Sequence, residues 1–197
     1  MPNWCVNSLN LAHENPEMIT RAVKAASEGR LLSEFVPCPQ DLHDAVCGSY
    51  NDPQQQAELE QKKAANIEQY GYPTWYEWSI ANWGCKWDPD IYAAVREDAN
   101  NASFAFDSAW SPPIAFYEQL EELGFVVEAY WYEPGMMFCG MREDCANDDY
   151  EIQGDSDWVV KHIPRAIDER MGISEGMAEW ENDPEYWGGT DELNTAE

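Results

Sequence analysis

Basic residues are scarce in this chain and missing from long parts of it. Its 197 residues include 11 Lys and Arg against 38 Asp and Glu, for a formal net charge of -27. No basic residue lies between Arg96 and Arg142, and none follows Arg170. Such a chain repels nucleic acids and anionic membranes, so we expect it to bind neither directly. A partner selected by charge should be basic.

Several patterns that mark common sites are also missing. The six cysteines form no C-x-x-C pair, which predicts reduced thiols and no iron–sulfur cluster. No apolar run approaches the roughly 18 residues of a membrane span. The N-terminus MPNWCVNSLNL lacks the basic and then apolar order of a signal peptide. We therefore expect a cytoplasmic protein. G-x-S-x-G and phosphate-binding glycine loops are absent too, so we expect no cofactor and no catalytic residues assignable from motifs.

Two weak metal-binding patterns remain. Cys38, His43 and Cys47 resemble part of a zinc site, but a tetrahedral site needs about four ligands and no clear fourth is present. The run DYEIQGDSDW, which begins at Asp149, imitates a calcium loop and lacks the glutamate that closes an EF-hand. The expected metal ligands are therefore none.

The chain is nevertheless rich in material for a core. The hydrophobic fraction is 44%, with ten Trp, ten Tyr and six Phe, so extensive disorder is not expected. The length fits one domain carrying an insertion. Trp75–Trp87 is tryptophan-rich but has only Lys86 as a base, which favours core packing over base stacking.

Apolar periodicity and turn residues predict the order of the elements. A helix should follow the cap Asn15, a short aromatic helix should follow Thr74, and another should start at Ser111 before two prolines. A last helix should start at Ser156 or Asp157. We expect strands at residues 4–12, 91–98, 102–109, 125–132, 136–141 and 148–153.

Three segments are harder to assign. Residues 35–42 are broken by prolines and favour a loop, and 53–71 favour a helix of the insertion. Pro164 should kink the last helix. The tail, residues 172–197, has eight acids and no base, which predicts partial disorder.

This order contains the β-α-β-β-α-β arrangement of the ferredoxin-like sandwich, an α+β fold. We expect a ferredoxin-like domain at residues 1–142, with a helical insertion at about 30–87 after the first helix. Residues 143–197 should form an acidic C-terminal extension with one helix and a tail.

Four motifs in this order resemble the YubB or Api-type proteins of plasmids and phages. They are MPNWCVN at 1–7, WYEWSIANWGCKWD at 75–88, FAFDSAWSPP at 104–113 and EPGMMFCG at 133–140. The resemblance implies a mobile-element protein with a ferredoxin-like domain. It covers residues 1 to about 140 and implies no activity or catalytic residues.

Negative charge is concentrated in the second half of the chain. Residues 101–197 hold 23 acids and 4 bases, and seven acids fall within 143–157. The hypothesis is a non-enzymatic DNA mimic whose carboxylates bind a basic nucleic-acid-binding host protein. The setting that the resemblance implies suggests a restriction or CRISPR-type defence protein, or another DNA-handling protein, as the target. The candidate partner-binding residues are Glu118, Glu121, Glu122, Glu143, Asp144, Asp148, Asp149, Glu151, Asp155 and Asp157.

Two alternatives stay open at this stage. The acids at 144–157 could serve a metal-dependent hydrolase, since paired carboxylates can hold Mg²⁺ or act as acid and base. The chain could also be an acidic interaction module without mimicry, because negative charge by itself aids solubility. The sequence leaves the target and the oligomeric state open.

Overall fold

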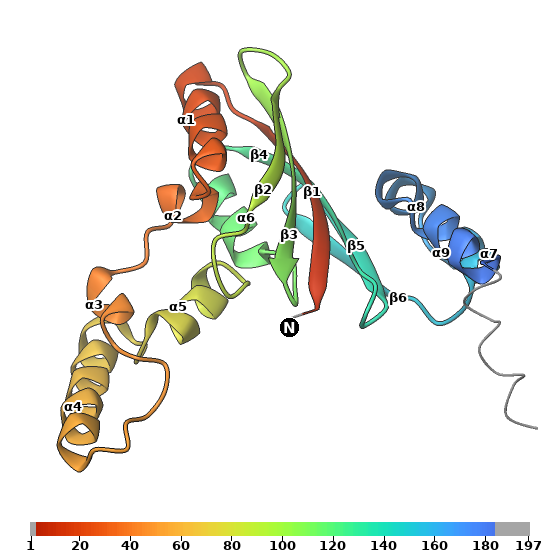
Figure 1. The fold of residues 1–197 in the computed structure, drawn as a ribbon. Helices are drawn as coiled ribbons and strands as arrows, with labels where there is room; N and C mark the ends of the chain where they lie inside the picture. Colours follow the sequence, from red (N-terminus) through yellow and green to blue (C-terminus); the bar gives the residue numbers. More distant parts are fainter. Residues whose placement is uncertain (1–2, 184–197) are drawn as a thin grey trace, which may run out of the picture.

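The computed structural model describes residues 3–183. It has an α+β fold built on one six-stranded antiparallel sheet, with the strand order β2-β3-β1-β4-β5-β6 (Figure 1). The six predicted strands are confirmed, each with ends within two residues of the expected positions. The strands are β1 (Trp4–Ala12), β2 (Ile91–Arg96), β3 (Asn101–Ala109), β4 (Val126–Glu133), β5 (Phe138–Glu143) and β6 (Ala146–Glu151).

The central strand β1 separates two faces of the sheet. Leu9 pairs with Phe104 of β3 and with Ala129 of β4, and all three are buried. Side chains alternate along a strand, so Ser8 and Asn10 point the other way and are half-buried. We call the side of Leu9 the front face and the side of Ser8 the back face.

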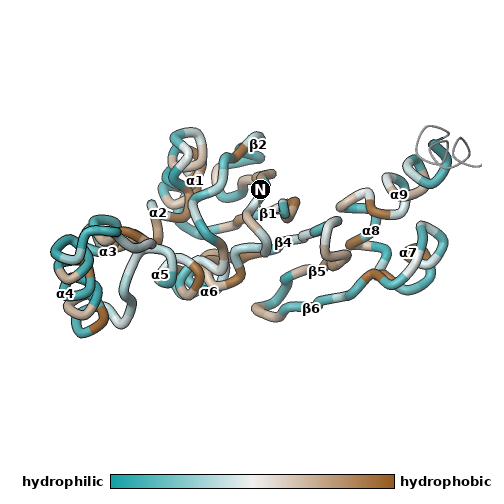
Figure 2. Tube along the Cα trace, turned by 60° about the horizontal axis from the view of Figure 1, so that its bottom comes forward, coloured by the Kyte–Doolittle hydropathy of each residue, from teal (hydrophilic) through white to brown (hydrophobic). Residues whose placement is uncertain are grey.

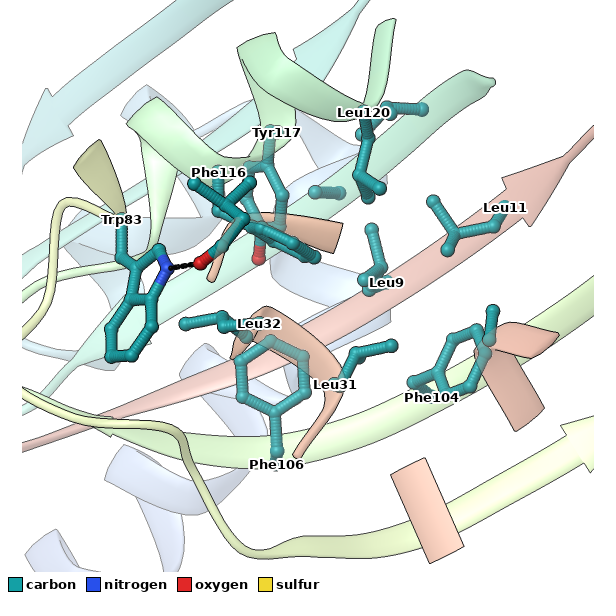
Figure 3. Packing of buried hydrophobic residues seen from close by; sticks show 14 of the residues in the cluster. Leu9, Leu11, Leu31, Leu32, Trp83, Phe104, Phe106, Phe116, Tyr117 and Leu120 are labelled. Carbon is teal, nitrogen blue, oxygen red and sulfur yellow. Dashed lines mark hydrogen bonds between the residues drawn. The ribbon is translucent and has the colours of Figure 1, made fainter. Parts of the chain in front are cut away.

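The front face carries the larger hydrophobic core. Phe106 from β3, Tyr117 from α6 and Leu31 from α2 are fully buried there (Figure 3). Asn15 caps the first helix by accepting a hydrogen bond from the backbone N–H of Glu17 at 3.0 Å, as predicted. The helices of this face are α1 (Pro16–Ser27), α2 (Leu31–Phe35) and α6 (Ile114–Glu122).

The start of α6 differs from the prediction. Ser111 does not cap it; the helix begins at Ile114, and the Ser111 hydroxyl donates to the Gly84 carbonyl at 2.7 Å. A residue followed by proline is pushed out of the helical region. Ser111 precedes Pro112, which precedes Pro113, so helical geometry starts only after the second proline.

A chain of hydrogen bonds holds this strand-to-helix corner. Buried Asn7 donates to the Ser108 hydroxyl at 2.8 Å, which in turn donates to the Ser111 carbonyl at 2.6 Å. With the bond from Ser111 to Gly84, the chain joins three of the four motifs that carry the family resemblance. These hydrogen bonds give the three segments a structural role at the corner.

The insertion between α1 and β2 is helical, as expected, but its helices begin at Leu31, well before the predicted helix at 53–71. Residues 35–42 are not a continuous loop, because they contain the end of α2 and the start of α3. Leu42 is fully buried, and its burial stabilises a short helical turn that the prolines alone do not predict. In Figure 1, α4 projects away from the sheet. The remaining helices of the insertion are α3 (Gln40–His43), α4 (Pro53–Tyr70) and α5 (Trp75–Asn82).

The tryptophans of the insertion pack as predicted. Trp78 and Trp83 are buried and meet edge to face, with ring centroids 5.5 Å apart. The Trp83 ring nitrogen donates to the Val36 carbonyl at 2.9 Å (Figure 3). Thr74 caps α5 by accepting from the backbone N–H of Tyr76 at 3.2 Å. The prediction of core packing is therefore confirmed for Trp78 and Trp83.

The C-terminal part corrects several predictions, because it holds three helices where one was expected. Asp155, and not Ser156 or Asp157, caps α7, and Pro164 separates two helices instead of kinking one. Residues 173–181 form a helix where partial disorder was expected; residues 184–197 of that expectation lie outside the described residues. The helices are α7 (Ser156–His162), α8 (Arg165–Met171) and α9 (Ile173–Glu181).

These three helices pack on the back face, at the other end of the sheet from α1 (Figure 2). Val159, Ile163 and Ile167 form a second core with Tyr130 and Cys139 of the sheet. Because the two helix layers lie on opposite faces at opposite ends, two parts of the sheet stay accessible. They are the front face of β6 and the back face of β2 and β3.

Candidate functional site

The acids expected to bind a partner lie on three elements. Glu118, Glu121 and Glu122 belong to α6, Asp155 and Asp157 to the N-terminus of α7. The other five belong to the hairpin of β5 and β6, which we call the acidic hairpin. They are Glu143, Asp144, Asp148, Asp149 and Glu151.

The acidic hairpin ends in a two-residue turn. Glu143 pairs with Ala146, and between them Asp144 and Cys145 have φ angles of 50° and 61°. Positive φ at both central residues is what a type I′ turn requires, and this turn matches the twist of the strands. Asp144 is therefore held at the exposed tip.

Strand β6 is an edge strand, and its carboxylates are exposed. Asp149 pairs with Gly140, and Glu151 pairs with Phe138, so both side chains point to the front face. Asp148 pairs with Met141 and points to the back face. All three acids are solvent-exposed. Negative charge on an edge strand also discourages pairing with the edge of another sheet.

An ion pair joins the acidic hairpin to α6. Arg142 of β5 donates to both carboxylate oxygens of Glu121, at 2.9 and 2.6 Å, and to the Asn147 side-chain oxygen at 2.7 Å. The arginine is only 3% exposed. The hydrogen bonds with Glu121 raise the pKa of Arg142 above its ordinary value. Glu121 therefore neutralises a buried cation, whereas Glu118 and Glu122 on the same helix are exposed.

The remaining negative charge shifts the acidity of nearby groups. The charge of Glu121 raises the pKa of the exposed Cys145 thiol, with a further contribution from Asp144 and an opposing one from Arg142. Burial, followed by Glu128 and Glu143, raises the pKa of Tyr130 to about 12. The Cys145 shift indicates a net negative potential at the tip of the hairpin.

The acids of α7 lie apart from this group. Asp155 accepts a hydrogen bond from the backbone N–H of Trp158 at 2.9 Å, so its carboxylate caps the helix. Asp157 is exposed in the first turn. Helix α7 packs on the back face through Val159, whereas α6 packs on the front face. The structure therefore brings α6 and the acidic hairpin together and leaves the α7 acids on the other side of the sheet.

The weak zinc pattern does not converge. His43 stacks on Trp75 at 6.3 Å between ring centroids, and Cys47 donates to the Thr74 hydroxyl at 3.0 Å, while Cys38 is half-buried. Within residues 3–183, no three His, Cys, Asp or Glu side chains are placed to hold a metal ion. The six cysteines are free thiols.

One pocket was not predicted from the sequence. It lies at the β2 edge of the back face and is lined by Trp4, Trp87, Tyr92, Asp90 and Asp107, among others. These residues come from three separate parts of the chain. The density of tryptophan around residue 87 was the available signal, but it also fits core packing, and the partners of Trp87 depend on the fold.

Comparison with known proteins gives one distant structural similarity. No family model matches the chain, and no curated protein matches it. The crystal structure of a protein api92 from Yersinia pseudotuberculosis, assigned to the DUF1281 family, is similar with a TM-score of 0.38 and 10% sequence identity. The match covers 78% of this chain and 99% of that one. It is a weak and distant link to an Api-type protein.

The helices were also compared with the requirements of a membrane span. Among the described residues, no helix has both the length and the apolar character needed to cross a bilayer.

Proposed function

We propose that the chain is a non-enzymatic binding protein whose acidic hairpin and neighbouring α6 occupy a basic DNA-binding surface of another protein. The observation that carries this proposal is the exposed row of carboxylates on the edge strand β6, next to the exposed acids of α6. The formal net charge of -27 strengthens the attraction to any basic partner. The same charge would prevent the chain from binding DNA itself.

The spacing of the carboxylates is compatible with that of phosphates. Asp148, Asp149 and Glu151 lie along three residue steps of β6, which is about 10 Å of extended strand. Asp149 and Glu151 share the front face and lie two residue steps apart, about 7 Å of strand, which is close to two phosphate steps of about 3.4 Å along one strand of duplex DNA. A groove that binds phosphates could therefore contact these two carboxylates at once.

The biological setting is part of the proposal. The resemblance to YubB or Api-type proteins implies a plasmid or phage protein, for which a restriction or CRISPR-type defence protein is a suitable target. We also infer that β1, α1, β2, β3, α6 and β4 form a ferredoxin-like unit. Their order along the chain supports this inference, since it is β-α-β-β-α-β once the insertion is set aside.

Competition with duplex DNA tests the proposal. The tagged chain is used to capture basic proteins from a host lysate, and duplex DNA is then added. Under mimicry, DNA displaces the captured protein, and binding weakens as salt rises because the charges are screened within about 10 Å at 0.1 M salt. A captured complex that duplex DNA does not displace would favour the alternative hypothesis, an acidic interaction module without mimicry.

Charge reversal locates the binding surface. Lys at Asp148, Asp149 and Glu151 should weaken binding of the captured partner by at least about tenfold. Lys at Glu58 and Glu60 serves as the matched control, since both are exposed on the distant α4. Equal losses in the two variants would argue against a defined acidic surface. Glu121 is left unchanged, because replacing it would leave the buried Arg142 guanidinium without its carboxylate partner.

Metal dependence addresses the hydrolase alternative. A cation present at a hundred times its dissociation constant adds about 2.7 kcal/mol to the stability of the folded state. We expect melting curves in EDTA, Ca²⁺, Mg²⁺ and Zn²⁺ to differ only by general screening. A saturable shift of that size with one ion would favour the hydrolase.

A further inference from the structure

A pocket of about 340 Å³ opens at the β2 edge of the sheet, opposite the edge that carries the acidic hairpin. Trp4 and Asp107 contribute from the back faces of β1 and β3, and Tyr92 from β2. Trp87 and Asp90 come from the segment before β2. The volume lies in the range of small-ligand sites, about 300 to 1,000 Å³.

The aromatic walls of this pocket are open to solvent. Trp4 is 44% exposed and Tyr92 is 62% exposed. The Trp4 and Trp87 rings meet edge to face with centroids 6.4 Å apart, which fixes their positions relative to each other. Large aromatic side chains held at the rim of a cavity are typical of sites that bind a ligand by its flat or cationic part.

Trp87 already contacts one cation of the chain, the side chain of Lys86. The Lys86 ammonium lies 4.7 Å from the Trp87 ring centroid and 5.2 Å from that of Trp110. Trp110 has a φ of 69°, a left-handed conformation that is uncommon for a bulky residue. The backbone thus keeps this indole beside Lys86, and the Trp87 ring is in use as a cation-binding surface.

Three carboxylates line the pocket, but they are not equivalent. Asp88 accepts hydrogen bonds from the backbone N–H groups of Leu32 and Ser33, both at 2.8 Å, so its oxygens hold the start of α2. Asp90 is exposed. Desolvation raises the pKa of Asp107 above its ordinary value, although the Tyr92 hydroxyl acts in the opposite direction. A partly desolvated carboxylate of this kind gains from a cationic partner.

We propose that this pocket binds the guanidinium group of an arginine side chain from a partner polypeptide. A guanidinium is planar, stacks on aromatic rings and donates two parallel hydrogen bonds to a carboxylate. Trp4, Trp87 and Tyr92 supply the rings, and Asp107 and Asp90 supply the carboxylates. The proposal does not depend on DNA mimicry, because the pocket and the acidic hairpin lie at opposite edges of the sheet.

A pair of isosteric probes tests the proposal on the full chain. The indole N–H signals are followed by NMR during titration with Nα-acetyl-L-arginine amide and with Nα-acetyl-L-citrulline amide, which has the same shape without the charge. We expect saturable shifts of a subset of indoles with the arginine probe, and binding at least about tenfold weaker with citrulline. Equal binding of the two probes would overturn the proposal. A third probe, Nα-acetyl-trimethyllysine amide, carries a cation without N–H donors, and tighter binding of this probe than of the arginine probe would overturn the proposal as well.

Variants separate the pocket from the general charge of the chain. Asp107→Asn should weaken the arginine probe about tenfold, whereas Asp149→Asn, on the opposite edge, should change its affinity less than about twofold. Tyr92→Leu should also weaken binding, with Tyr50→Leu as the control, since both tyrosines are exposed. Equal effects of Asp107→Asn and Asp149→Asn would show attraction to net charge only and would overturn the proposal. The probe comparison uses the unmodified chain, so it stands even if a variant fails to fold.

Discussion

Strands β3 and β6 belong to one sheet but differ in how they are stabilised. β3 has a neighbour on each side and buries Phe104 and Phe106 under the front-face helices. β6 pairs on one side only and exposes Asp148, Asp149 and Glu151. Burial and exposed negative charge are thus divided between the two ends of the sheet, so a substitution at one end can alter stability without altering the charge of the other.

The division has a simple electrostatic reason. Carboxylates are costly to bury and repel one another, so they accumulate where side chains stay in water. The acidic hairpin is held instead by its backbone ladder with β5 and by buried Arg142. These contacts do not involve Asp148, Asp149 or Glu151, whose carboxylates stay exposed to solvent.

The largest expected effect is at the buried end. Phe106→Ala removes a fully buried ring from the main core and should lower the free energy of unfolding by about 3 to 5 kcal/mol. Replacing the half-buried Tyr150 of β6 by Ala is the comparison and should cost about 1 to 2 kcal/mol. Urea denaturation followed by tryptophan fluorescence measures both. Equal costs would mean that the two ends do not differ in the way proposed.

An intermediate effect is expected at the ion pair that joins the two regions. Glu121→Gln leaves the buried Arg142 guanidinium without a carboxylate and should lower the free energy of unfolding by about 1 to 2 kcal/mol. Glu122→Gln, one residue away and exposed, should change it by less than about 0.5 kcal/mol. If the two variants unfold alike, the Arg142–Glu121 pair contributes nothing measurable to holding the hairpin.

The smallest effect probes the negative potential at the hairpin tip. Because the charge of Glu121 raises the pKa of Cys145, less of this thiol is ionised at a given pH than in an ordinary cysteine, and its alkylation should require higher pH. Raising the salt from about 0.05 M to about 0.5 M screens the acids, lowers this pKa and should speed alkylation by neutral iodoacetamide about twofold.

Mass spectrometry of the peptide containing Cys145 measures this rate as a function of pH. Free cysteine at the same two salt concentrations is the control for any direct effect of salt on the reagent. A Cys145 rate that is independent of salt would contradict a strong local potential.

Much of the secondary structure could be predicted from the sequence because it depends on local interactions. Asn15 and the strand alternation from Trp4 act within a few residues, and both were predicted correctly. The failures also have local causes. Consecutive prolines moved the start of α6 beyond Ser111, and Pro164 divided a helix that periodicity alone had made continuous.

The candidate site was less accessible from the sequence. Seven acids in 143–157 marked the acidic hairpin, but nothing local indicated that Glu121 would be bound by Arg142 while Glu118 stayed exposed. Glu118 and Glu121 are three residues apart and lie on neighbouring positions of α6. Only the way in which α6 packs beside β5 determines that Arg142 reaches Glu121. The position of Asp155 as a cap likewise depended on where α7 begins.

The α+β class, the six strands, the aromatic content of the core and the excess of negative charge could all be predicted from the sequence. Each of these follows from composition or from contacts between near neighbours along the chain. The placement of the helix layers on opposite faces at opposite ends is known only from the fold, as are the contact of Arg142 with Glu121 and the pocket that Trp4, Trp87 and Asp107 line. These pairings join residues far apart in sequence, and they are set by strand order and packing, which no local pattern encodes.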